Sequence, residues 1–212
     1  MLIGLCVVFL VYLSSRLFDL YTLNWILDNF LSSVLLVIVI IFQHDIRRAL
    51  IQVGSRPIFG SDLRLGGQDL EEIVRAVVTL ASRRIGGLVV LERETGLTEY
   101  SEGGTALDAQ ISRELIVSIF VADSPIHDGA IVIRKGRLTA AGCFLPLTAN
   151  PNVSKTLGTR HRAAIGITEE SDAVVIAVSE EDGGISLVAA GRITRDLDAA
   201  TLRATLQKLM VG

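Results

Sequence analysis

Residues 130–143, AIVIRKGRLTAAGC, contain two apolar runs that flank a short polar turn. The runs Ala130–Arg134 and Arg137–Cys143 have the length and composition of β-strands, and Lys135-Gly136 between them is typical of a hairpin turn. This stretch therefore predicts a β-hairpin.

The same pattern recurs toward the C-terminus. Ala173–Val178 and Ile185–Ala190 are strand-like runs joined through Glu180–Gly184, and Leu88–Leu91 is a further short apolar run upstream. Short apolar runs bounded by glycine-rich turns are typical of strands. The sequence therefore predicts a sheet of several strands, most of them paired in hairpins.

Helical periodicity marks three further segments. The apolar residues of the first recur at the spacing of one helix face and end before Gly86-Gly87: Leu70, Ile73, Val74, Val77, Val78 and Ala81. The other two segments are Ser112–Phe120 and Asp198–Met210. Because helices and hairpins interleave without a regular βαβ alternation, the sequence predicts an α/β fold with a mixed central β-sheet flanked by helices.

Composition excludes several classes of protein. The chain has 212 residues with a net charge of −3, so no global basic field favours nucleic acid. Hydrophobic residues make up 50% and mean hydropathy is +0.52, which argues against a disordered chain. Two cysteines and three histidines leave no disulfide framework and no Cys/His-rich zinc site.

The N-terminal region is the most apolar part of the chain. Trp25–Gln43 is near the length that crosses a bilayer, and its run VLLVIVII is apolar on every face. We therefore expect residues 1–44 to form a membrane anchor of one or two transmembrane helices, with a buried core helix as the alternative. Arg47 and Arg48 follow the segment and place the rest of the chain in the cytoplasm by the positive-inside rule.

Residues 45–66 read as a juxtamembrane connector, broken at Pro57 and Gly60, and residues 67–212 as one globular domain.

The run His127-Asp128-Gly129 stands immediately before the first strand of the opening hairpin. A carboxylate beside an imidazole at a strand edge, followed by a residue without a side chain, suits a divalent cation held near a phosphate. Asp-Gly is also a very common turn dipeptide, and spacing alone favours that simpler explanation.

A second polar cluster, Arg160-His161-Arg162, follows Gly158-Thr159, a pair that can open a helix. Two guanidinium groups, a hydroxyl and free backbone N–H groups at a helix N-terminus suit a polyphosphate. A solvated basic turn explains the cluster equally well. The acidic turn between the last two predicted strands reads as a solvated hairpin tip that could bring Glu180 or Glu181 toward a metal.

Together these motifs resemble a known family. HDGAIVI (127–133) and LGTRHRAAIGITEESDAVVIAVSEEDGGIS (157–186) resemble the diadenylate cyclase (DAC) domain, whose signatures are a DGA and an RHR motif. The apolar segment FLSSVLLVIVIIFQHDIRRAL (30–50) resembles the membrane-anchored bacterial branch known as CdaA or DacA. The resemblance implies the DAC fold for residues 67–212 and the condensation of two ATP into cyclic di-AMP with release of two pyrophosphates.

The resemblance also implies roles for the first motif. Asp128 is the catalytic carboxylate, which binds the metal and helps to deprotonate the 3′-hydroxyl, and Gly129 and Ala130 let the nucleotide approach closely. His127 and Glu181 are further candidate metal ligands. The cofactor implied is a divalent cation: Mn²⁺, Mg²⁺ or Co²⁺.

For the substrate, the resemblance implies four phosphate-binding residues and two that line the adenine pocket. The phosphate-binding residues are Thr159, Arg160, His161 and Arg162, and the adenine-pocket residues are Phe144 and Leu145. Each protomer would bind one ATP, and two protomers would meet face to face as a homodimer.

Further partners implied by the resemblance are the lipid bilayer, a YbbR-domain regulator and phosphoglucosamine mutase. The chain does not resemble the DNA-scanning branch, so no nucleic-acid partner is expected. The expected location is the bacterial cell membrane, with the catalytic domain in the cytoplasm.

The alternative function is a catalytically silent nucleotide sensor or scaffold on the same fold. A phosphodiesterase that degrades the dinucleotide would need a His- and Asp-rich metal cluster that the sequence lacks.

Overall fold

The computed structural model describes residues 65–151, 153–154 and 157–210, together with Trp25, Ser33, Leu36, Val37, Val39 and Ile40. The chain divides into two compact units, Met1–Ala49 and Leu50–Gly212. The predicted anchor and connector lie almost entirely outside the described residues. Among the residues that are described, no helix is long and apolar enough to cross a membrane.

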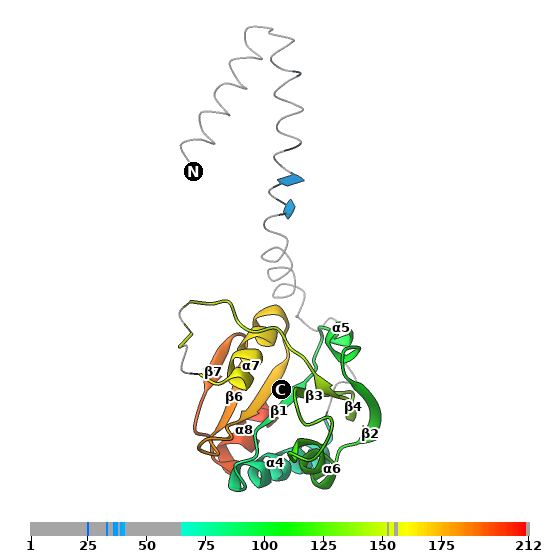
Figure 1. Cartoon of the computed structure of the whole chain (residues 1–212), viewed down its shortest axis with the longest axis vertical. Coiled ribbons are helices and arrows are strands. Elements are labelled where there is room, and N and C mark those ends of the chain that lie inside the picture. The colour runs from blue at the N-terminus through cyan, green and yellow to red at the C-terminus, as the bar shows by residue number, and fades with distance from the viewer. Residues whose placement is uncertain are drawn as a thin grey trace. The chain divides into compact units, whose positions relative to one another are not determined.

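A mixed seven-stranded sheet forms the centre of the second unit, in the order β2-β4-β3-β1-β5-β6-β7 (Figure 1). The strands are β1 (Gly87–Leu91), β2 (Thr105–Gln110), β3 (Ala130–Arg134), β4 (Arg137–Cys143), β5 (Val174–Val178), β6 (Ile185–Ala189) and β7 (Arg192–Thr194). Only the β1–β3 pair is parallel, and every other neighbouring pair is antiparallel. Because parallel and antiparallel pairs occur together, the prediction of a mixed sheet is confirmed. The two predicted hairpins are β3–β4 and β5–β6.

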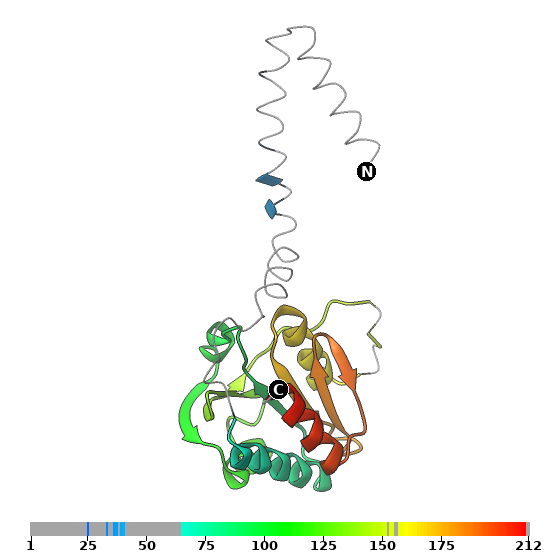
Figure 2. The ribbon, with the colours of Figure 1, turned by 180° about the vertical axis from the view of Figure 1, so that it is seen from behind.

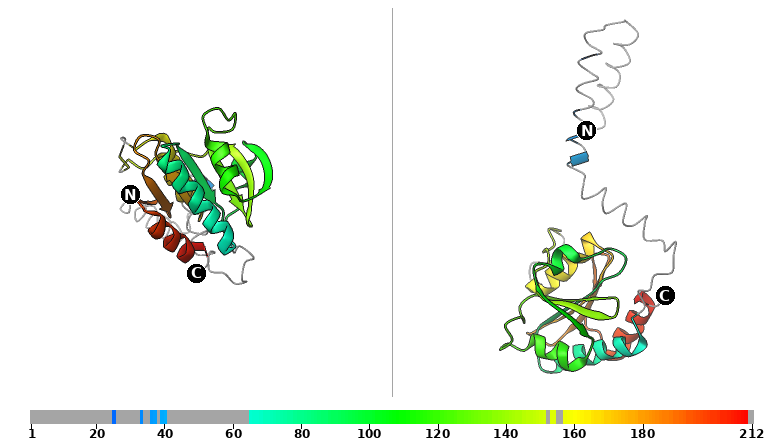
Figure 3. Two further views of the ribbon diagram at one scale, coloured as in Figure 1. Left: turned by 90° about the horizontal axis from the view of Figure 1, so that it is seen from below. Right: turned by 90° about the vertical axis from the view of Figure 1, so that its right-hand side faces the viewer.

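Helices cover both faces of this sheet. They are α4 (Gly67–Ser82), α5 (Thr98–Ser101), α6 (Arg113–Phe120), α7 (Thr159–Glu170) and α8 (Ala199–Met210). Figure 2 shows α4 and α8 in front of the sheet, and the left view in Figure 3, seen from below, shows them side by side. The side view in Figure 3 shows α7 on the opposite face. The result is three layers, helix on sheet on helix.

The central strands explain this layering. Every residue of β1 and β5 is buried, so neither face of these strands meets solvent. Successive side chains point to opposite faces: Val89 and Leu91 pack in the core under α4, α6 and α8, whereas Leu88 and Val90 pack in the core under α7. Each fully buried Val, Leu or Ile contributes about 1.5–3 kcal/mol to folding.

The helix ends follow from local hydrogen bonding. Ser112 caps α6, because its hydroxyl oxygen accepts a hydrogen bond from the Leu115 backbone N–H at 3.3 Å. A carboxylate oxygen of Asp198 accepts one from the Thr201 backbone N–H at 2.7 Å in the same way, just before α8. Each cap is the first residue of the segment that the sequence predicted to be helical.

The buried face of α4 differs from its prediction at three positions. Val78, which the periodicity assigned to the inner face, is 36% exposed, whereas Ala76 and Leu80 are fully buried. The buried face of α4 therefore includes two residues, Ala76 and Leu80, that the predicted apolar spacing left out.

Candidate active site

One edge of the sheet gathers the chain segments that carry the predicted motifs. Because β3 runs parallel to β1 and antiparallel to β4, the start of β3 lies beside the start of β1 and the end of β4. Because β5 runs antiparallel to β1, Val178 at its end pairs with Gly87 at the beginning of β1. Thus the sheet topology itself brings together stretches that are far apart in sequence.

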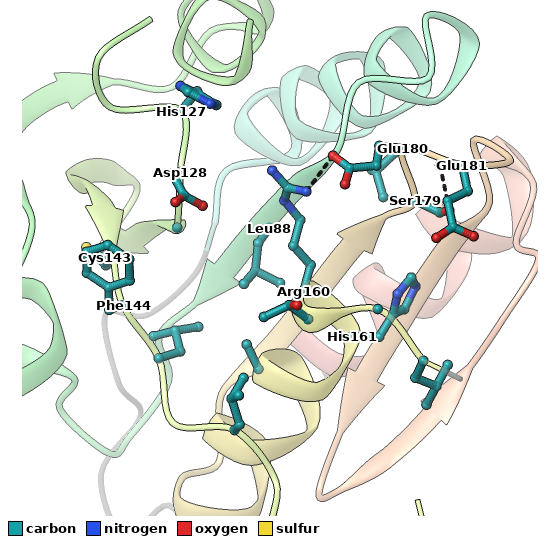
Figure 4. A pocket seen from close by; sticks show the side chains of 18 of the residues that line it. Leu88, His127, Asp128, Cys143, Phe144, Arg160, His161, Ser179, Glu180 and Glu181 are labelled. Carbon is teal, nitrogen blue, oxygen red and sulfur yellow. Dashed lines mark hydrogen bonds and ion pairs between the residues drawn. The ribbon is translucent and has the colours of Figure 1, made fainter. Parts of the chain in front are cut away.

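A cavity of about 860 Å³ opens at this edge (Figure 4). Its volume falls within the range of small-molecule sites. Five stretches line it: residues 127–129, the end of β4 with Phe144, Leu145 and Leu147, residues 157–161 at the start of α7, residues 178–182 at the β5–β6 turn, and Arg195 after β7. Leu88 and Ala163 complete the lining.

The Asp128-Gly129 turn supplies a carboxylate to one wall. Asp128 is exposed, and Figure 4 shows its carboxylate directed into the cavity toward Arg160. Gly129 has φ +108°, and a Cβ there would lie 2.7 Å from the Cys143 carbonyl oxygen. Only glycine satisfies both conditions, so Gly129 fixes the position from which Asp128 enters the cavity.

His127 lies at the rim next to Asp128. Its Nδ1 lies 2.6 Å from the Ser124 carbonyl oxygen, which can only accept, so Nδ1 carries the proton and donates. That tautomer leaves the lone pair on Nε2, the form in which histidine ligates metals.

The start of α7 supplies the opposite wall. Thr159, Arg160 and His161 line the cavity, and Arg160 Nη1 donates to Glu180 Oε2 at 2.8 Å. The N-terminal end of a helix carries unpaired backbone N–H groups and partial positive charge, which favour a phosphate. Arg162, the second arginine of the run, does not line the cavity.

His161 is only 6% exposed, and its Nε2 lies 3.2 Å from the Ser186 hydroxyl oxygen. Burial lowers its pKa, and the nearby Arg195 guanidinium lowers the pKa further, against the opposing charges of Asp182 and Glu181. His161 is therefore neutral near pH 7 and acts as a hydrogen-bonding group.

An apolar rim lies beside these polar walls. Phe144 is 71% exposed and Leu147 46% exposed, and both line the cavity with Leu145 and Leu157. Exposed large apolar side chains at the mouth of a cavity suit a flat aromatic group such as a nucleobase. Ala130 does not line the cavity, because it is fully buried in β3.

The β5–β6 turn brings three carboxylates to the cavity: Glu180, Glu181 and Asp182. Hydrogen bonding with the Ser179 side chain and the Gly184 backbone N–H lowers the pKa of Asp182 and keeps it ionised. Within the described residues, no group of three or more His, Cys, Asp or Glu side chains could hold a metal ion by itself. Mg²⁺ commonly takes one or two carboxylates plus substrate phosphates, so this donor set fits a metal shared with a nucleotide.

Sequence reasoning assigned no role to Arg195 or Leu88, although both line the cavity. Arg195 lies far along the chain from the RHR run, and no local motif marks it. Its position follows from the pairing of β7 with β6, which carries the residue after β7 to the same sheet edge.

Comparison with known proteins identifies the family of the chain. Residues 74–193 match the family model DAC, described as DisA bacterial checkpoint controller nucleotide-binding. The chain is 42% identical over 208 residues to the cyclic di-AMP synthase CdaA of Bacillus subtilis, covering 96% of this chain and 76% of that protein. It is also 42% identical over 212 residues to a diadenylate cyclase of Listeria monocytogenes, covering 98% of this chain and 78% of that protein.

Solved structures also resemble the chain, among them the following two. DacA from Staphylococcus aureus aligns with a TM-score of 0.67 at 44% identity, over 68% of this chain and 97% of that one. A hypothetical membrane spanning protein from Bacillus cereus aligns with a TM-score of 0.58 at 39% identity, over 60% of this chain and 62% of that one. The chain therefore belongs to the DAC family, the diadenylate cyclase family that its two motifs predicted.

Proposed function

We propose that this protein is a diadenylate cyclase, a nucleotidyltransferase that condenses two ATP into cyclic di-AMP and releases two pyrophosphates. The observation that carries the proposal is the placement of Asp128 and the start of α7 on facing walls of one cavity (Figure 4). A carboxylate for the attacking hydroxyl and a cationic helix end for the phosphates are the two parts that phosphoryl-transfer chemistry requires.

The roles of the side chains follow from their positions. The apolar rim of Phe144 and Leu145 holds the adenine, and Thr159, Arg160 and His161 hold the phosphates. Asp128 accepts the proton of a 3′-hydroxyl, and that oxygen attacks the α-phosphorus of the second ATP. The bond from the α-phosphorus to pyrophosphate breaks in line with this attack.

Symmetry of the product implies two protomers. Each ATP must serve as both nucleophile and electrophile, yet the chain contains one DGA and one RHR motif. Two copies that face each other through a two-fold axis would place each 3′-hydroxyl next to the α-phosphate of the other nucleotide. We therefore propose a face-to-face homodimer as the catalytic form.

A divalent cation, Mn²⁺, Mg²⁺ or Co²⁺, would supply Lewis-acid polarisation and charge neutralisation at the phosphates. Asp128 would hold it together with the substrate, with His127 Nε2 and Glu181 as candidate further ligands.

The comparisons support a membrane association, since the matched solved structures include one described as a hypothetical membrane spanning protein. We propose that residues 1–44 anchor the enzyme in the bacterial cell membrane with its catalytic domain in the cytoplasm. Because of the family resemblance, we also propose a YbbR-domain regulator and phosphoglucosamine mutase as partners. The alternative of a silent sensor receives no support from the relatives, whose names describe cyclases.

The test is direct. The purified full chain in mild detergent is incubated with ATP and each of the three cations, and products are separated by liquid chromatography with mass detection. A cyclase yields cyclic di-AMP and pyrophosphate in a ratio of one to two. Nucleotide binding without product would instead identify the silent sensor.

A further inference from the structure

The guanidinium of Arg160 is tied to the β5–β6 turn. Arg160 Nη1 donates to Glu180 Oε2 at 2.8 Å, and the side chains are 24% and 63% exposed respectively. Figure 4 shows the guanidinium of Arg160 held at the tip of the Glu180 side chain, with Asp128 facing it across the cavity. One residue from α7 and one from the turn thus meet inside the cavity.

Gly86, just before β1, provides the space in which this pair forms. A Cβ at Gly86 would lie 2.6 Å from Arg160 Nη1, 2.8 Å from Arg160 Cζ and 2.9 Å from Glu180 Oε2. Its φ is not positive, so the backbone conformation alone does not demand glycine. The absence of a side chain at Gly86 therefore serves the Arg160–Glu180 pair.

The hydrogen-bonding state of Arg160 limits which nitrogen can reach a substrate. Nη1 donates one of its two N–H groups to Glu180, and Nε is buried with no hydrogen-bond partner among the described residues. The second N–H of Nη1 and both N–H groups of Nη2 are left to contact phosphate oxygens. An arginine free to rotate could turn any of its nitrogens toward the cavity, whereas the bond to Glu180 restricts how this guanidinium is oriented.

We infer that Glu180 is a positioning residue that aims Arg160 at the nucleotide phosphates, and that Gly86 is glycine to accommodate the pair. The inference rests on the proposed function, because it assumes that Arg160 contacts ATP. An ion pair with one partner this exposed contributes little to folding stability, so its principal effect is on orientation. Fixing the guanidinium before ATP binds lowers the entropy cost of aligning the phosphates.

The experiment compares full-length wild type with Glu180→Gln and Gly86→Ala. The glutamine keeps the shape and removes the charge, and the Cβ of the alanine lies so close to both side chains that the guanidinium and the carboxylate must move. Both variants should keep the wild-type melting temperature, lower kcat about ten- to a hundredfold, and weaken affinity for a non-hydrolysable ATP analogue only about threefold. A KM effect that exceeds the kcat effect would overturn the inference.

Two matched controls isolate the effect. Glu114→Gln makes the same chemical change in an exposed ion pair with Arg113, outside the cavity. Gly96→Ala adds a methyl group where no atom lies within 4 Å of the new Cβ. Both controls should retain wild-type kcat.

A double-mutant cycle tests whether Glu180 acts through Arg160. In an Arg160→Ala background, Glu180→Gln should cause no further loss of kcat or of affinity for the analogue, because the residue that it positions is gone. Additive losses would overturn the inference. If raising the metal concentration restored Glu180→Gln activity, Glu180 would be a metal ligand and the inference would be wrong.

Failure of the proposed function is distinguishable from failure of this inference. If wild type binds the ATP analogue but makes no cyclic di-AMP, the cyclase proposal fails. The same double-mutant cycle is then measured as affinity for the ATP analogue by calorimetry. If Glu180→Gln weakens binding in wild type but not in the Arg160→Ala background, the inference is supported. If it weakens binding equally in both backgrounds, the inference is overturned.

Discussion

His161 Nε2 lies 3.2 Å from the hydroxyl oxygen of Ser186, and both side chains are buried between α7 and β6. Burial lowers the pKa of His161, so the folded protein favours the neutral imidazole. The unfolded chain therefore binds a proton at His161 more readily, near the ordinary histidine pKa of about 6.5. The stability that the neutral imidazole contributes is fully present above this pKa. It is lost as the pH falls through the lower pKa of His161 in the folded protein.

His161→Gln should therefore flatten the fall in melting temperature between about pH 7.5 and pH 5.5. The side-chain amide can still bond Ser186 but does not titrate. Calorimetric melting of both proteins across this range measures the effect. Parallel curves for wild type and variant would show that another group accounts for the acid sensitivity.

Arg195 is the cavity-lining cation that no motif marked. Its charge lowers the pKa of His161, so Arg195→Ala should raise that pKa, a shift that NMR titration of the imidazole measures. Loss of a cation from the cavity should also weaken ATP binding and reduce its dependence on salt. An unchanged His161 titration together with unchanged affinity would place Arg195 outside the phosphate site.

The two arginines of the RHR run should differ in effect. Arg160 lines the cavity and Arg162 does not. Arg160→Ala should cost about 1.5–3 kcal/mol in ATP binding or transition-state stabilisation, the contribution of a charge-assisted hydrogen bond. Arg162→Ala should cost less, and the two values come from kcat/KM. Equal losses in both variants would indicate that Arg162 also reaches the nucleotide, for example across the dimer.

A dimeric mechanism predicts a dependence on enzyme concentration. Residues 65–212, diluted over a wide range, should lose specific activity as dimers dissociate, and light scattering follows mass in parallel. The full-length protein should lose less, because anchoring in a bilayer raises the local concentration of protomers. A monomeric species that makes cyclic di-AMP at full specific activity would contradict the two-protomer proposal.

Strong local patterns made much of the fold predictable. The β3–β4 and β5–β6 hairpins and helices α4, α6 and α8 agree with the predicted ranges to within a few residues, because each combines apolar periodicity with a turn or cap. The strands β2 and β7 were missed. Their residues are exposed or half-buried, so edge pairing rather than hydrophobic pattern creates them.

The residues that line the cavity were predictable where a short motif or the family resemblance marked them. Asp128-Gly129 and Thr159–His161 carry recognisable motifs, and the structure brings both to one cavity. The Arg160–Glu180 pair, its dependence on Gly86 and the place of Arg195 arise from tertiary packing. No local signal encodes contacts among four separate chain segments.

We propose that Asp128 is the catalytic carboxylate for cyclic di-AMP synthesis in this cavity. The most direct measurement is the rate of product formation by Asp128→Asn beside wild type, with melting temperature recorded for both. The substitution is isosteric at an exposed position, so the fold should persist and the melting temperature should stay the same. The proposed mechanism predicts loss of cyclic di-AMP with the fold intact, because the variant lacks the charge that we propose for binding the cation and the attacking hydroxyl. Near wild-type turnover in a folded Asp128→Asn protein would contradict it.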